Sequence, residues 1–239
     1  MQPVTPQRIV KIETLCISHL PLLRVHTDQG LIGSGESFYA PQAVAAMLHD
    51  WMSNRLIGAN ALDIEKQWCF FYERFINFGG RGAELRALSA LDLALWDILC
   101  QSCELPIWQL LGGRTRELIP AYCSPGGTSY GVVDPTWVGG ISETKRIADM
   151  AIPYNIPVAM HDCTGPLTLL AGLHVGVANH NVVFQETVRA HLRIVYPKLI
   201  DQEISVVQGA IAPPDRVGIG AAWLPDLFSN DHPSYRVTT

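Results

Sequence analysis

The sequence is poor in charged residues and has no run of basic ones. Only 16% of its 239 residues are Asp, Glu, Lys or Arg, and the formal net charge is −5. Nucleic acids and anionic membrane surfaces attract positively charged proteins. The composition therefore argues against either of them as the main partner.

The sequence also lacks the cysteine patterns and long apolar runs that mark several other classes. Its six cysteines form no pairs arranged with histidine at zinc-site spacing, and the chain is too long for a disulfide scaffold. The longest apolar stretch, residues 167–178, contains His174 and is too short to span a bilayer, and the first residues carry no apolar signal-peptide core. We therefore expect a cytoplasmic protein with reduced thiols and no membrane partner.

What the sequence does contain is ample apolar material, 48% of all residues, arranged in two successive patterns. Residues 8–17 alternate between apolar and polar, and residues 22–26 and 31–36 add two more strands of an antiparallel meander. Helical spacing of apolar residues begins at residue 41 and covers three segments. These patterns predict an α+β domain of residues 1–115, in which a meander packs on three helices.

The second part, residues 116–239, alternates strands with helices. A short apolar run within 117–127 is a candidate first strand. Further strands are expected at 132–134, 157–160 and 181–185, and helices between them at 142–154, where Ser142 is a plausible N-cap, and 165–179. Connections of this length make the strands parallel.

Asp134 and His161 follow two of these predicted strands directly. The carboxyl ends of parallel strands share one edge of the sheet, and ligands bind at that edge. The pair is therefore a candidate for an imidazole that a carboxylate orients and makes more basic. The alternative is that Asp134 caps a turn and His161 is an ordinary loop histidine, and the spacing alone leaves both open.

Several longer motifs carry a resemblance to a known family. They are GLIGSGES (30–37), ALSALDLALWDILCQ (87–101), PIWQLLGG (106–113), DPTWVGGISETKRIA (134–148), HDCTGP from residue 161, and FQETVRA (184–190). The chain resembles the mandelate racemase/muconate lactonizing enzyme branch of the enolase superfamily, and most of all its acid-sugar dehydratases of the galactonate type. Enolase-superfamily sites, in which a Lys or His base works with Mg²⁺, are a known example of acid–base tuning.

The resemblance implies an α+β capping domain followed by a (β/α) TIM-type barrel, a Mg²⁺ cofactor and a sugar acid as substrate. Asp134, His161 and Glu186 match the residues that end the sixth, seventh and eighth barrel strands. In the family the first two form the catalytic dyad, and the third binds the substrate carboxylate. His19 and Leu20 lie where the family's cap loop closes over the substrate, so the resemblance implies that they contact the substrate. The alternative is that His19 is an ordinary exposed loop histidine.

The sequence departs from the family in its second half. Residues 117–239 amount to about half of a typical TIM barrel of ~250 residues. The expected fold is therefore a partial, internally truncated barrel that lacks about strands two to five, with the seam between residues 124 and 133. Those strands carry the family's three Mg²⁺ ligands, so the ligands are expected to be missing and no metal residue is assigned.

The other acidic residues offer no substitute ligands. The motifs place none of the later carboxylates at a strand end facing the dyad, and the earlier ones are predicted to lie in turns or on helix surfaces. The later group is Asp162, Asp201, Glu203, Asp215 and Asp226. The earlier group is Glu13, Glu36, Asp92 and Asp97.

Two functions from different classes follow. One is a Mg²⁺-dependent lyase that dehydrates a sugar acid. The other is a non-catalytic remnant that at most associates with other subunits, for example as a homo-oligomer, and we favour it for this chain alone. A racemase or epimerase is a second alternative, disfavoured because Trp137 stands where a racemase would carry a Lys base. Nucleophilic catalysis by Cys163 is not expected, because sequence neighbours on an extended chain point apart.

Overall fold

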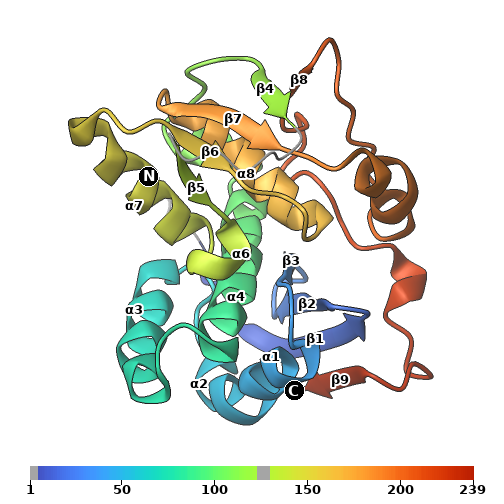
Figure 1. The fold of residues 1–239 in the computed structure, drawn as a ribbon. Coiled ribbons are helices and arrows are strands. Elements are labelled where there is room, and N and C mark those ends of the chain that lie inside the picture. Colours follow the sequence, from blue (N-terminus) through green and yellow to red (C-terminus); the bar gives the residue numbers. More distant parts are fainter. Residues whose placement is uncertain (1–4, 123–129) are drawn as a thin grey trace.

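The computed structural model describes residues 5–122 and 130–239, and these form two sheets with helices packed between and around them (Figure 1). The first sheet has the strand order β3-β2-β1-β9. Its bounds are β1 Ile9–Ile17, β2 Leu20–Thr27, β3 Ile32–Glu36 and β9 Tyr235–Thr238. The antiparallel meander is as predicted, with Leu22 opposite Leu15 and Glu36 opposite Leu22.

The fourth strand of this sheet was not predicted. The carboxyl-terminal segment runs back along the molecule and β9 pairs with β1, so that the first and last strands of the described chain are neighbours in one sheet (Figure 1). Tyr235 helps to hold this strand in place, because its hydroxyl donates a hydrogen bond of 2.6 Å to the buried carboxylate of Glu13.

The helices of the amino-terminal part cover one face of the meander. They are α1 (Pro41–Ala46), which continues through a π-helical turn η1 (Met47–Met52) into α2 (Ser53–Leu56), then α3 (Ile64–Phe75), η2 (Ile76–Phe78) and α4 (Ala83–Ser102). Strand β3 lies directly against α4, since a side chain at Gly33 or Gly35 would collide with the carbonyl oxygens of Ala94 and Ala90. The two glycines are therefore a packing requirement.

The second sheet has the order β5-β6-β7-β4-β8. Strands β5 (Gly131–Val133), β6 (Val158–Met160), β7 (Val182–Glu186) and β4 (Ile119–Tyr122) are parallel to their neighbours, as predicted. The two-residue strand β8 (Ala210–Ile211) adds an antiparallel edge beside β4. The predicted seam falls mainly on residues outside those that the structure describes.

The remaining helices connect and cover this sheet. They are α5 (Ile107–Leu110), α6 (Pro135–Val138), α7 (Ile141–Ala151), η3 (Ile152–Tyr154), α8 (Pro166–Ala178), η4 (His191–Val195), η5 (Tyr196–Lys198) and η6 (Pro225–Leu227). Helix α8 is apolar all round and buried almost throughout, as expected of a helix enclosed on every side. None of the described helices is both long and apolar enough to cross a membrane.

Buried carboxylates join the two halves, which corrects the expectation that Glu36, Asp92 and Asp97 lie in turns or on helix surfaces. All three are at most 3% exposed, and Glu13, expected at the surface with them, is 6% exposed. Asp92 accepts hydrogen bonds from the backbone N–H and the hydroxyl of Ser142. The predicted N-cap is therefore wrong: Gly140 occupies that position, and a carboxylate from α4 binds the first turn of α7 instead.

Candidate functional site

The dyad predicted from the sequence is formed. Strands β5 and β6 are neighbours with Val133 opposite Met160, so the residues that follow them meet at the same sheet edge. The Nδ1 atom of His161 lies 2.7 Å from Oδ2 of Asp134. The backbone N–H of His161 also donates to the carbonyl oxygen of Val133, which continues the strand pairing up to the dyad.

Asp134 fulfils both roles that the sequence left open. Its Oδ1 atom accepts from the backbone N–H of Thr136 at 2.7 Å and from the Thr136 hydroxyl at 2.6 Å, so it caps the short helix α6. Its Oδ2 atom faces the imidazole. Because the capping bonds fix the carboxylate, Nδ1 of His161 carries the hydrogen that is donated to Asp134 when the ring is neutral, and Nε2 is left for other chemistry.

Three side chains surround the Nε2 side of the partly buried ring. Oε2 of Glu186 lies 3.6 Å away and Sγ of Cys163 lies 3.3 Å away. The Trp137 ring covers the imidazole, with a centroid distance of 4.8 Å. The contact with Cys163 corrects the expectation that the two side chains point apart: they are two residues apart, and alternate residues of an extended chain share one face.

The electrostatics favour a protonated imidazole. Burial alone opposes the charge on His161, but the hydrogen bond and negative charge of Asp134, with Glu186 and Asp162, raise the pKa of His161 above its usual value. This is the direction expected for a histidine that binds and releases a proton near neutral pH.

Two further carboxyls near the dyad are fully buried. Burial raises the pKa of Asp162 to about 8, although the Tyr196 hydroxyl donates to it at 2.8 Å. Burial likewise raises the pKa of Glu36 to about 8, although it accepts from the N–H and hydroxyl of Thr168 at the start of α8. Near pH 7 these carboxyls are therefore largely neutral and serve to hold the segment that carries His161.

The two predicted substrate contacts have different surroundings. His19 is exposed, and its ring lies 6.0 Å from Phe38 and 6.2 Å from Tyr39. Tyr39 in turn stacks on Trp137 at 6.3 Å, so His19 lies at the rim of the site. Leu20 is 7% exposed, is the first residue of β2 and packs in the core, so little of its side chain is available to a ligand, and its substrate contact stays a prediction.

The sequence analysis missed the aromatic and cationic residues of this rim. The Arg86 guanidinium lies 5.3 Å from the Trp137 ring and 5.5 Å from the Tyr39 ring. Arg86 also donates to the carbonyl oxygen of Phe38 at 2.8 Å. Trp137 was identified from its position in the motif. Tyr39, which follows β3, and Arg86, on α4, are brought next to it only by the fold.

The described residues do not fit a metal ion. Within residues 5–122 and 130–239 no group of three or more His, Cys, Asp or Glu side chains is arranged to hold one. Two of the carboxylates considered as substitutes are engaged elsewhere, since Asp201 pairs with Arg216 and Asp215 pairs with Arg114. Hard cations need several convergent oxygen ligands.

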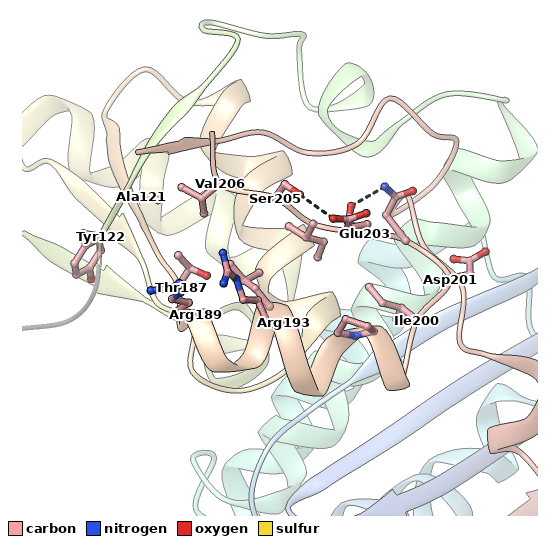
Figure 2. A pocket seen from close by; sticks show the side chains of 14 residues that line it. Ala121, Tyr122, Thr187, Arg189, Arg193, Ile200, Asp201, Glu203, Ser205 and Val206 are labelled. Atoms are coloured by element: carbon pink, nitrogen blue, oxygen red, sulfur yellow. Dashed lines mark hydrogen bonds between the residues drawn. The ribbon is translucent and has the colours of Figure 1, made fainter. Parts of the chain in front are cut away.

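A cavity of about 760 Å³ lies at the same sheet edge, beyond β7 and β4 (Figure 2). Tyr122, Thr187, Arg189 and Arg193 are among its lining residues. None of the dyad residues lines it, and neither does Glu186. The cavity therefore lies beside the dyad, on the far side of Glu186, and is not lined by the dyad itself.

A two-domain arrangement with a histidine–carboxylate dyad at the strand ends defines the class as an enolase-type protein. The chain belongs to the mandelate racemase/muconate lactonizing enzyme group of the enolase superfamily, as the sequence resemblance indicated. Residues 2–112 match the family described as mandelate racemase/muconate lactonizing enzyme, N-terminal domain, and residues 114–227 match the enolase C-terminal domain-like family.

Relatives of known name are similar over part of the chain. A D-galactonate dehydratase from Klebsiella pneumoniae is 36% identical over 145 residues, which cover 58% of this chain and 34% of the relative. A D-mannonate dehydratase from Xanthomonas oryzae pv. oryzicola is 41% identical over 98 residues, which cover 40% and 23%. The chain thus spans about a third or less of the curated relatives it matches.

Solved structures show the same fold. An enolase of the mandelate racemase subgroup from Agrobacterium tumefaciens superposes with a TM-score of 0.86 and 23% identity, over 97% of this chain and 98% of that one. The fold therefore consists of an amino-terminal capping domain and a carboxyl-terminal α/β domain.

Proposed function

We propose that this chain retains the proton-transfer residues of an acid-sugar dehydratase but does not complete the dehydration by itself. The observation that carries the first part is the 2.7 Å contact between His161 Nδ1 and Asp134 Oδ2 at the ends of neighbouring strands. The named relatives, dehydratases of galactonate and mannonate, support a sugar acid as the substrate class.

The chain's own groups have distinct roles in this proposal. In a complete site of this kind His161 would take the proton from the carbon beside the substrate carboxylate through Nε2, with Asp134 orienting the ring and stabilising its positive charge and Glu186 on the same side of the site. Without a metal to stabilise the negative charge that this step develops, the step is not expected to proceed in this chain alone. In the superfamily a bound Mg²⁺ stabilises the dianion that this step produces. The described carboxylates do not converge on a metal site, and this disagreement supports the second part of the proposal.

We also propose that the barrel is internally shortened. The described part of the second sheet has four parallel strands, and β4 pairs with β7 while β5 pairs only with β6. A shortened barrel would account for the lack, among the described residues, of a group arranged to hold a metal ion, because the family carries its ligands on the intervening strands.

Proton exchange tests the chemistry directly. The protein is incubated with galactonate and mannonate in deuterated water, with and without Mg²⁺, and the α-proton is followed by NMR. We expect neither exchange nor a dehydrated product. Mg²⁺-dependent exchange that disappears in His161→Asn would overturn the proposal in favour of an active dehydratase.

A further inference from the structure

The Nε2 atom of His161 has a second possible partner besides a substrate, and that partner is a thiol. Cys163 Sγ lies 3.3 Å from Nε2, while Nδ1 on the opposite side of the ring is held by Asp134. Cys163 is partly exposed, and the His161 side chain is 18% exposed. A thiol, an imidazole and a carboxylate in this order are the arrangement in which a base activates a sulfur nucleophile.

We propose that Cys163 is a reversible modification site, at which a small disulfide of the oxidised-glutathione class forms a mixed disulfide that blocks Nε2 of His161. The Cys163 S–H proton passes to Nε2, and the sulfur attacks one sulfur of the disulfide. The S–S bond breaks as the new one forms, and the departing thiolate takes up a proton. The Cys163 thiol is restored, and Nε2 of His161 becomes accessible again, when a free thiol attacks the mixed disulfide. This inference goes beyond sugar-acid chemistry and does not depend on it.

The surroundings decide how the thiol must react. Burial and the carboxylates of Glu186, Asp162 and Asp134 raise the pKa of the Cys163 thiol, so the resting form is S–H and not a free thiolate. Tyr196, which donates a hydrogen bond to Asp162, also interacts with Cys163. Cys163 therefore needs His161 as a proton acceptor, and its reaction should speed up as rising pH deprotonates the imidazole.

The chain contains its own comparison residues. Cys69 and Cys103 are also partly exposed, and the hydrogen-bond partners that the structure gives their side chains are Glu65 and Ser102, neither of them an imidazole. If exposure alone controlled the reaction, all three thiols would react at similar rates. If the imidazole controls it, Cys163 will react ahead of the others.

The test is peptide mapping by mass spectrometry after timed exposure of the native protein to oxidised glutathione, repeated with uncharged iodoacetamide. With both reagents we expect Cys163 to be modified before Cys69 and Cys103, and its rate of modification to fall by about tenfold or more in His161→Asn. Reduced glutathione should restore the thiol after treatment with oxidised glutathione, but not after alkylation by iodoacetamide. His161→Gln serves as a second variant, and only variants that melt like the parent are compared. Equal rates at the three cysteines, or an unchanged Cys163 rate in both His161 variants, would overturn the proposal.

Discussion

The buried carboxyl of Asp92 makes the stability of this protein depend on pH in a predictable way. Asp92 is 1% exposed on α4 and accepts from the N–H and hydroxyl of Ser142 at 3.0 and 2.6 Å. Burial raises its pKa from 3.8 to about 7, against the opposing effect of those hydrogen bonds. In Asp92→Asn the side-chain amide is neutral at every pH, so the part of the pH dependence of stability that comes from Asp92 disappears.

The sign follows from proton linkage. Between about pH 4 and about pH 7 the folded state holds a proton on Asp92 that the unfolded state has lost, so the free energy of unfolding falls as pH rises through this range. From about pH 5 to above pH 8 the loss is about 2 to 3 kcal/mol, at 1.36 kcal/mol per unit of pKa difference. For a chain of this size that equals a change in Tm of about 4 to 12 °C.

The assay is urea unfolding followed by tryptophan fluorescence at about pH 5 and about pH 8.5. We expect Asp92→Asn to cost more stability at the lower pH than at the higher, by about 2 to 3 kcal/mol. Ser142→Ala is the comparison variant, because it keeps the titrating carboxyl and removes only the hydroxyl, with its hydrogen bond to Asp92 and the one it accepts from Trp96. Since the bond to Asp92 lowers the pKa, its loss raises the pKa further, and the fall in stability with rising pH should persist in this variant. Equal costs of Asp92→Asn at both pH values would refute the reasoning.

Four further outcomes are expected. Asp134→Asn should lower the pKa of His161 followed by NMR titration, because its charge raises that pKa, and an unchanged value would mean that the dyad is not formed in solution. Millimolar Mg²⁺ should leave Tm unchanged, since only binding to the folded state stabilises it; a clear rise would reveal a metal site. Gly35→Ala should cost about 1 to 3 kcal/mol or more in urea unfolding, because the added methyl would lie 2.0 Å from the Ala90 carbonyl oxygen, and a neutral result would contradict that close packing. Leu20→Ala should cost about 2 to 5 kcal/mol, as for other buried leucines, whereas an exposed residue would cost far less.

The sequence was sufficient to predict the dyad because that prediction required only the order of the elements. An apolar run that ends in Asp134 and another that ends in His161, joined by a helix, determine parallel neighbouring strands and a shared edge. Both residues lie where that rule places them, with Glu186 at the end of β7, the next strand along. A two-residue shift in either strand boundary would not have changed this result.

The parts that could not be predicted depend on contacts between residues far apart in the chain. A carboxylate on an amphipathic helix is normally assigned to solvent, and nothing local to Asp92 reveals that the start of α7 will cover it. The same is true of Leu20, where the strand begins earlier than the turn residues suggest. Cys163 was misplaced because it was treated as an adjacent residue of His161, whereas residues two apart on an extended chain lie on the same face.

The geometry of the candidate site depends on both domains at once. The segment from His161 to Gly165 leads into α8, and Glu36 at the end of β3 holds the first turn of that helix through Thr168. Gly165 and the Glu36 carboxylate are in close contact, since a Cβ atom added at Gly165 would lie 2.4 Å from the carboxylate. On the other side Asp162 is held by Tyr196. The segment that carries the imidazole is therefore held by a carboxyl of the capping domain on one side and by a hydroxyl of the α/β domain on the other, while Asp134 orients the ring itself.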